Sequence, residues 1–298
     1  MIFVCGDIHR AYDYYKVPLL VRQLNEDGTI DRCLKDNEPI YIICTGDFGF
    51  IWNNAKGYKK KDGFGVAKED SSELQDCFNS LAENTTITFL FLDGNHENFD
   101  MLNAVKKSVK WGGYVQQVAA HVYHLMRGEI YTLDGLTFLT IGGGLSVDKK
   151  YRTKGKTWWP QEELSQDEAD YAMKNFEAHN LKVDYILSHT CPQPVVNRLE
   201  AECLPAYDTA TWGQKTDDPT AIRLTPFALV GDFKAWIFGH FHIDHQTTWH
   251  HKPYYCQIDN FIKIPTKAGE ELEIIIPADE KTHGFNRVDD SPQIFNYV

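Results

Sequence analysis

Five short segments of the sequence carry polar side chains of the kinds that bind divalent metal ions. They are Gly6-Asp7-Ile8-His9, Gly46-Asp47, Gly94-Asn95-His96-Glu97, Ser188-His189 and Gly239-His240-Phe241-His242. Carboxylate oxygen, amide oxygen and imidazole nitrogen together suit Mn, Fe, Co or Zn better than Ca. Two such ions about 3.5 to 4 Å apart can clamp a phosphoryl group and share a bridging hydroxide as the nucleophile. The residue types therefore predict a two-metal phosphoesterase site.

Each of these segments follows a short apolar run that predicts a buried β-strand. The runs are Met1 to Cys5, Ile40 to Cys44, Ile87 to Leu92, Val183 to Leu187 and Ala235 to Phe238. Sites in open α/β sheets lie at the carboxyl ends of the strands, so we expect the polar side chains to gather at that edge. His240 and His242 are two residues apart, which on a regular strand would direct them to opposite faces. We therefore expect this pair in a turn beyond the end of the strand.

A two-metal site needs one carboxylate that bridges the ions, and we assign this role to Asp47. The other expected ligands are Asp7, His9 and His242 on one ion and Asn95, His189 and His240 on the other. Manganese is the first choice of metal, with Fe, Zn, Co or Ni as alternatives.

The length and composition predict one large α/β domain, since 298 residues with 43% hydrophobic side chains can bury a sizeable core. We expect this domain to span residues 1–276 and to be followed by a loosely held tail over 277–298. Helices are expected at Tyr12 to Asn25 and around Ser71 to Glu83. Their alternation with the first three strands is the βαβαβ pattern of a mainly parallel sheet.

The middle of the chain predicts a second, more antiparallel sheet. Its expected strands are Val122 to Leu125, Glu129 to Leu133 and Leu136 to Ile141, the last two joined by a turn at Asp134-Gly135. A helix is expected over Gln161 to His179, with Ser165 and Glu168 as a capping box. Residues 192–232 are rich in Pro, Thr and Asp with weak periodicity, which predicts a long loop that could serve as a lid.

Charge and cysteine content narrow the expected partners and location. The formal net charge is −12 and no basic cluster exceeds Lys59-Lys60-Lys61, which argues against non-specific nucleic-acid binding. Seven scattered cysteines without a CxxC pattern indicate a reducing cytoplasm. No apolar run approaches the roughly 20 residues of a membrane helix, so no membrane association is expected. The expected partner is a phosphate-ester substrate, and the sequence does not predict an oligomeric state.

The five segments together resemble the motifs of the calcineurin-like metallophosphoesterases, which read D-x-H, G-D, G-N-H-[D/E], H and G-H-x-H in this order. The resemblance covers roughly Met1 to Ile258, and every ligand position is filled. It implies a four-layer α/β/β/α sandwich of two packed mixed β-sheets with flanking helices. It also implies that His96 is not a ligand but a general acid for the leaving group, supported by Glu97.

The sequence departs from this pattern in two places. The second motif commonly reads G-D-x-x-D, whereas here Phe50 stands at the position of the second carboxylate. The protein Ser/Thr phosphatase branch also carries phosphate-binding arginines after its second and third motifs, and they are absent here. Arg10 and Arg152 are the candidates to replace them, and Asn95 is a candidate for substrate contact as well as for metal binding.

These observations predict a dinuclear metal-dependent phosphoesterase that acts on phosphodiesters or phosphomonoesters. We favour diesters, because a doubly charged monoester depends more on the missing arginines than a singly charged diester does. Three alternatives remain open. They are a protein Ser/Thr-type phosphatase, a nuclease of the same fold and a binding scaffold of this fold that has lost catalysis.

Overall fold

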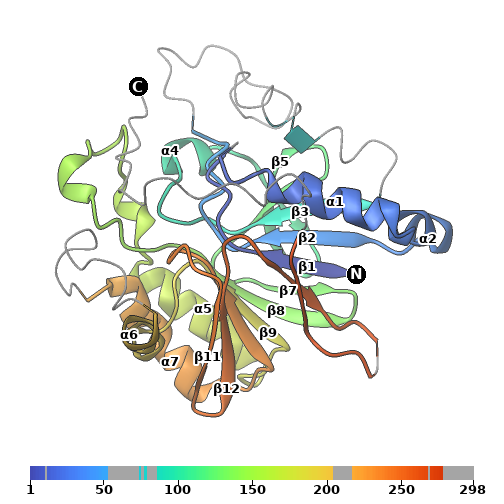
Figure 1. The fold of residues 1–298 in the computed structure, drawn as a ribbon. Helices are drawn as coiled ribbons and strands as arrows, with labels where there is room; N and C mark the ends of the chain where they lie inside the picture. Colours follow the sequence, from blue (N-terminus) through green and yellow to red (C-terminus); the bar gives the residue numbers. More distant parts are fainter. Residues whose placement is uncertain are drawn as a thin grey trace.

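The apolar runs that precede the five polar segments form strands of two β-sheets that pack face to face (Figure 1). The computed structural model describes residues 1–10, 12–52, 74, 77–78, 86–203, 217–267 and 269–277. The predicted tail, apart from residue 277, and most of the helix predicted around Ser71 to Glu83 lie outside these residues. The division into one domain and a tail therefore stays a prediction.

The first sheet has the strand order β14-β13-β1-β2-β3-β6-β5-β4. Its strands are β1 (Ile2–Cys5), β2 (Ile40–Cys44), β3 (Ile87–Phe91), β4 (Lys107–Lys110), β5 (Gly113–Ala119), β6 (Val122–Leu125), β13 (Phe261–Ile264) and β14 (Glu273–Ile275). β1, β2, β3 and β6 run parallel to one another, while β13 pairs antiparallel with β1. The predicted parallel centre is confirmed, whereas β6 was expected in the second sheet and that prediction is wrong.

The second sheet has the strand order β11-β12-β10-β9-β8-β7. Its strands are β7 (Ile130–Leu133), β8 (Leu136–Ile141), β9 (Tyr185–Ser188), β10 (Ala235–Phe238), β11 (His245–Trp249) and β12 (Lys252–Cys256). The four inner strands are parallel and only the two edge strands pair antiparallel, so this sheet is also mixed. The prediction that it would be the more antiparallel sheet is wrong, since antiparallel pairing is more extensive in the first sheet. β7 and β8 are joined at Asp134 and Gly135, whose φ angles of +48° and +78° are those of the predicted tight hairpin turn.

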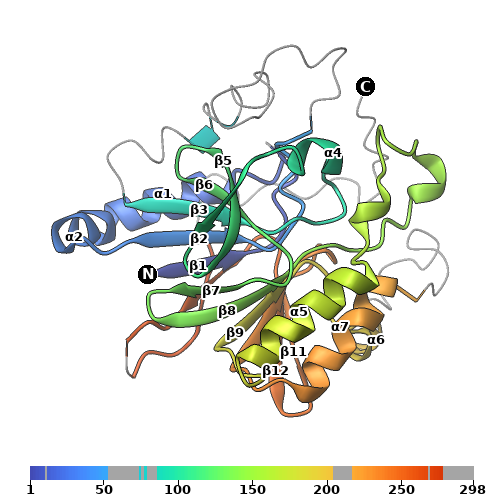
Figure 2. The same ribbon diagram turned by 180° about the vertical axis from the view of Figure 1, so that it is seen from behind.

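Helices cover the outer face of each sheet (Figures 1 and 2). The first sheet is covered by α1 (Lys16–Glu26) and α2 (Thr29–Asp36), and the second by α5 (Gln166–Ala178), α6 (Gln193–Glu202) and α7 (Pro219–Val230). A short helix, α4 (Phe99–Leu102), follows the third polar segment. Among the described residues, no helix combines the length and the apolar character needed to cross a membrane.

The core explains why the strands read as continuous apolar runs. On β1, Phe3 and Cys5 pack against the helices, while Ile2 and Val4 pack toward the second sheet. Since successive side chains of a strand alternate between faces, a strand covered on both faces has no polar position. The predicted four-layer architecture of two mixed sheets with flanking helices is confirmed.

The prediction of a long loop over residues 192–232 is wrong where the structure describes the segment, because α6 and α7 lie there. α6 buries Val195 and Leu199, and α7 buries Leu224 and Phe227, at spacings of three and four residues. Prolines hid this pattern, although proline is favoured in the first turn of a helix, where no N–H is needed. Residues 204–216 lie outside the described residues, so a lid function stays a prediction.

Candidate metal centre

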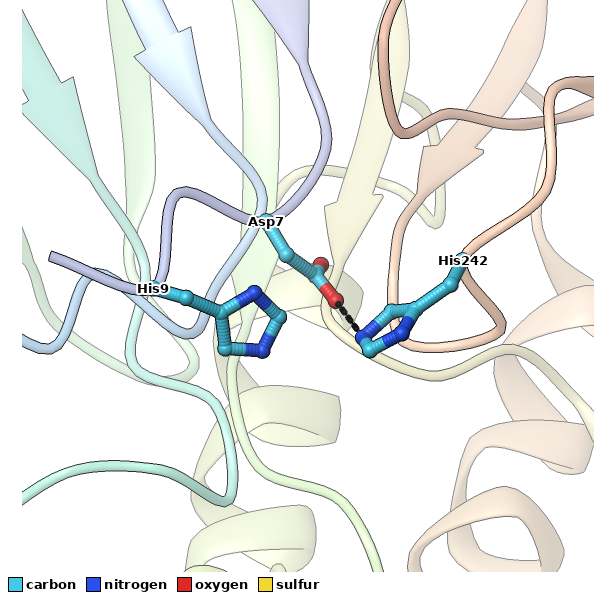
Figure 3. Close-up of side chains that lie close together, drawn as sticks. All are labelled: Asp7, His9 and His242. Atoms are coloured by element: carbon cyan, nitrogen blue, oxygen red, sulfur yellow. Dashed lines mark ion pairs between the residues drawn. The ribbon is translucent and has the colours of Figure 1, made fainter. Parts of the chain in front are cut away.

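The five polar segments leave their strands at the same edge of the two sheets and converge there. Backbone hydrogen bonds join neighbouring loops, since the His9 N–H donates to the Asp47 carbonyl oxygen at 2.7 Å. The Gly239 N–H likewise donates to the His189 carbonyl oxygen at 2.9 Å. Figure 3 shows Asp7 between His9 and His242, which come from opposite ends of the chain. The prediction that the five segments converge at the carboxyl ends of the strands is confirmed.

Four of the ligand candidates have left-handed backbone conformations. The φ angles are +45° for His9, +45° for Asp47, +70° for His240 and +51° for His242. Such angles are uncommon outside glycine and cluster at functional sites, where the surroundings enforce them. At His240 and His242 they produce the turn beyond the strand end that the two-residue spacing required.

Asp47 lies between imidazoles from two different sheets. Its Oδ2 is 3.3 Å from His9 Nε2 and its Oδ1 is 3.4 Å from His189 Nε2. The same Oδ1 accepts the backbone N–H of His96 at 2.7 Å. A carboxylate whose two oxygens face two different sets of donors has the placement that a bridging ligand needs.

The other candidate ligands surround Asp47. Asp7 Oδ2 lies 3.2 Å from His242 Nε2, and Asn95 Oδ1 lies 2.9 Å from His189 Nε2. His240 Nδ1 is 3.2 Å from His189 Nε2. Three groups of side chains hold their ligand atoms within 4.8 Å of one another, namely Asp7 with His9 and His242, Asp47 with His9 and His96, and Asp7 with Asp47 and His189.

The electrostatics of the site favour bound cations. Burial alone would raise the pKa of Asp47, but the charges of His189 and His96 and the hydrogen bonds to His189 and His9 together hold the pKa well below its usual range. Burial lowers the pKa of His9, yet hydrogen bonds to Asp13 and Asp47 raise it to about 10. Ionised buried carboxylates favour positive charge at this site, and a divalent metal ion would supply it in place of the imidazole protons.

Two further contacts orient the candidate ligands. Asp13 Oδ2 lies 2.7 Å from His9 Nδ1, and the Thr45 carbonyl oxygen lies 3.2 Å from His189 Nδ1. Metal-binding imidazoles commonly use their second nitrogen in this way, which fixes the ring orientation and leaves Nε2 for the metal. Sequence reasoning missed Asp13, although its place four residues after His9 on a turn is a usable signal.

His96 lies beside an arginine from a distant loop. Arg152 Nη2 is 3.2 Å from both ring nitrogens of His96, and Arg152 Nε donates to Asp148 Oδ2 at 2.8 Å. Burial is the main cause of a His96 pKa well below its usual range, and the positive charge of Arg152 adds to this effect. The structure thus brings together two residues that were predicted separately, one as an acid and one as a phosphate ligand.

Glu97 contacts the loop that follows Asp47. Its buried carboxylate accepts the backbone N–H of Phe48 at 2.7 Å and that of Gly49 at 3.3 Å. Burial, reinforced by the charge of Asp47, raises the pKa of Glu97 well above its usual range. These contacts hold the second motif against the third, and the support of His96 by Glu97 stays a prediction.

Arg10 lies in the loop that carries His9 and is half-buried, with a φ angle of +60°. Its backbone N–H donates to the Phe48 carbonyl oxygen at 3.0 Å. Its backbone is therefore tied to the same loop as Asp47, on the first sheet, whereas Arg152 reaches the site from the segment after β8.

Apart from Arg152, no residue of the segment after β8 was assigned to the site from the sequence. Gly144 packs closely against two candidate ligands, since a Cβ at this position would lie 3.1 Å from His189 Cδ2 and 3.3 Å from His240 Cε1. Two residues on, Ser146 Oγ accepts a hydrogen bond from Asn95 Nδ2 at 3.1 Å. The sequence could have indicated this segment, because β8 runs parallel to β9 and its carboxyl end therefore lies at the same edge of the sheet.

A buried ion pair lies behind the third motif. Asp93 Oδ2 accepts from Arg127 Nε at 2.7 Å, and Asp93 Oδ1 lies 3.0 Å from His124 Nε2. The Asp93 carbonyl oxygen also accepts the Gly143 N–H at 2.9 Å, which ties the third motif to the segment after β8. The group therefore joins the first sheet to the second at the site.

We expect Asp93→Ala to lower the free energy of unfolding by about 3 to 5 kcal/mol, because it removes the buried carboxylate that Arg127 and His124 share and leaves Arg127 with only the exposed carboxylate of Glu168 at 3.1 Å. Urea denaturation followed by circular dichroism measures this loss. Asp232→Ala is the matched control, since it removes an exposed carboxylate paired with Lys182 at 2.9 Å, and its stability should be that of the wild type. Equal stability of the two variants would contradict the structural role of Asp93.

A family model described as "Calcineurin-like phosphoesterase" matches residues 1–244. A search of curated proteins found no match. Among solved structures, TT1561 of Thermus thermophilus is 10% identical with a TM-score of 0.44, over 93% of this chain and 98% of that one. A putative 5′-nucleotidase from Staphylococcus aureus is 14% identical with a TM-score of 0.45, over 97% of this chain and 56% of that one. Similarity to solved structures at this level says nothing of what the chain binds.

Proposed function

Since the chain belongs to the calcineurin-like phosphoesterase family, we propose that it hydrolyses phosphate esters with the help of two divalent transition-metal ions. The ions would be held by Asp7, His9, Asp47, Asn95, His189, His240 and His242. Manganese is the first metal to test. A cytoplasmic location remains a prediction.

The observation that carries this proposal is the placement of Asp47. Its two carboxylate oxygens face His9 at 3.3 Å and His189 at 3.4 Å, and these imidazoles come from loops of different sheets. A single metal ion does not need a carboxylate placed between two imidazoles. Two metal ions do, because the carboxylate can then bind one ion with each oxygen.

When bound, the two ions supply Lewis acidity and a water molecule activated for attack on phosphorus. The protein's own residues supply the remaining steps. Arg152 lies where its guanidinium can pair with a phosphate oxygen, and His96 beside it can hold a proton for the leaving oxygen. A bound phosphate adds negative charge next to His96, which raises its pKa and favours the protonated form.

The test of this proposal is a screen of the pure protein after reconstitution with Mn, Fe, Co, Ni or Zn. Its substrates are chromogenic mono- and diesters, 2′,3′-cyclic nucleotides, a phosphopeptide and a single-stranded oligonucleotide. Metal-dependent turnover of any of them supports the proposal, and the preferred one separates a phosphodiesterase from a Ser/Thr-type phosphatase or a nuclease. Two bound ions without turnover of any substrate would favour the non-catalytic scaffold.

We expect a preference for diesters, with kcat/KM for bis-nitrophenyl phosphate about tenfold or more above that for nitrophenyl phosphate, since a dianion needs more charged partners. Assays of both substrates with manganese measure this ratio. Arg10→Ala and Arg152→Ala should each weaken the monoester more than the diester. A strong monoester preference that either substitution abolishes would contradict the expectation and show that the arginine provides the missing phosphate contact.

A further inference from the structure

The hydroxyl group of Ser146 lies between Asn95 of the candidate metal site and Arg152, which contacts His96. Ser146 is buried, and its Oγ donates to Glu162 Oε2. The same Oγ accepts from Asn95 Nδ2 at 3.1 Å and lies 3.5 Å from Arg152 Nη1. A hydroxyl group has one proton to donate, so every other hydrogen-bonding group around it must be a donor.

Glu162 fixes the direction of that proton. Its side chain is fully buried, and its second oxygen, Oε1, accepts the backbone N–H of Trp159 at 3.0 Å. Its own carbonyl oxygen accepts the Gly144 N–H at 2.8 Å. Burial raises the pKa of Glu162 to about 8, so its carboxyl group is ionised above that pH. In the ionised form both carboxylate oxygens act as acceptors, so Ser146 donates toward Glu162 and accepts from Asn95.

This direction decides which end of the Asn95 amide faces the metal site. The oxygen and nitrogen ends of an amide have nearly the same shape, so packing alone does not distinguish them. An acceptor at Ser146 selects the NH₂ end, and Oδ1 is then turned to His189 Nε2 at 2.9 Å. A reversed amide would place two N–H groups where a metal ion needs an oxygen.

We propose that Ser146 and Glu162 are positioning residues that fix the Asn95 amide with its oxygen toward the metal site. They act through Asn95 and touch no reacting atom. The part of the proposal that concerns metal affinity rests on the proposed function, whereas the orientation of the amide does not. Arg152 also lies 3.5 Å from Ser146 Oγ, although its closer hydrogen bond is to Asp148 Oδ2 at 2.8 Å.

The first measurement is independent of metal. In protein labelled with ¹⁵N-asparagine and measured above pH 8, where Glu162 is ionised, the Asn95 side-chain NH₂ should be protected from solvent exchange in the wild type and in Ser146→Thr, which keeps a hydroxyl group. We expect this protection to be lost in Ser146→Ala. An Asn95 NH₂ signal in Ser146→Ala with the wild-type shift and exchange rate would overturn the proposal.

The second measurement is calorimetric titration of the metal-free protein with Mn²⁺. We expect Ser146→Ala to bind one of two ions about 10- to 100-fold more weakly, the usual effect of removing a partner of a metal ligand, and Ser146→Thr to restore the affinity. Thr220→Val is the matched control, because it removes a buried hydroxyl that accepts from the Leu164 N–H at 3.0 Å without contacting Asn95. Equal weakening in this control would assign the effect to stability alone.

Glu162→Gln provides a test that does not depend on the folding of Ser146→Ala. A glutamine has one carbonyl oxygen, so it cannot accept from both Ser146 and the Trp159 N–H as the glutamate does. We therefore expect the same loss of Asn95 protection in this variant, and full protection would count against the proposal. A wild-type protein that binds no Mn²⁺ would refute the proposed function, while the Asn95 signals would still decide the orientation of the amide.

Discussion

Asp47→Asn is expected to lose metal and activity together. A neutral amide has one oxygen and no charge, so it cannot bridge two cations in the way proposed for the Asp47 carboxylate, which lies between His9 and His189. Loss of a partner that merely orients a ligand costs about 10- to 100-fold in affinity or activity, and the loss of a bridging ligand should exceed this range. Mass spectrometry of the metal content and turnover of bis-nitrophenyl phosphate measure the two effects.

Asp232→Asn is the control for the same chemical change at an exposed ion pair, and it should keep both metal content and turnover. Asp47→Asn should also remain folded, since the backbone N–H of His96 can still donate to the amide oxygen. If Asp47→Asn retains two ions per chain and nearly wild-type turnover, the bridging assignment is wrong.

His96→Ala is expected to keep its metal ions and to lose about 10²- to 10⁴-fold in rate on esters with poor leaving groups, which is the usual contribution of a positioned proton donor. Esters with an activated leaving group, such as nitrophenolate, need no proton and should suffer much less. The measurement is kcat for nitrophenyl and alkyl esters of the same phosphate class, together with the metal content.

His179→Ala, at the exposed end of α5, is the control and should leave both rates unchanged. Equal losses on nitrophenyl and alkyl esters would remove His96 from the role of the acid. A loss of metal in His96→Ala would instead indicate that His96 is a metal ligand. This alternative is compatible with the structure, because the ligand atoms of His9, Asp47 and His96 lie within 4.8 Å of one another.

Much of the candidate site followed from the sequence because its elements are local. Each predicted ligand stands a few residues after an apolar run, and an apolar run of that length between turn residues is sufficient to indicate a buried strand. Strands β1, β2 and β10 begin or end within one residue of the runs that predicted them. Parallel strands then present their following loops at one edge, so the seven ligand candidates could be grouped without coordinates.

The helices α6 and α7 were not predicted from the local sequence pattern. Prolines and threonines obscured their apolar spacing. The two helices pack on each other, on the second sheet and on α5, and these tertiary contacts bury their apolar side chains. Most helical stability in proteins comes from such tertiary packing, which intrinsic preference does not reveal.

By itself the sequence determined the kinds of ligand, their order and their place at strand ends, since these depend on residues that are adjacent in the chain. Only the tertiary structure decided which outer partners those ligands have. Asn95 meets Ser146 across 51 positions and His96 meets Arg152 across 56, because β3 and β8 lie in different sheets that pack with their carboxyl ends together. No local spacing encodes that packing, so the residues that orient the site became visible only in the folded chain.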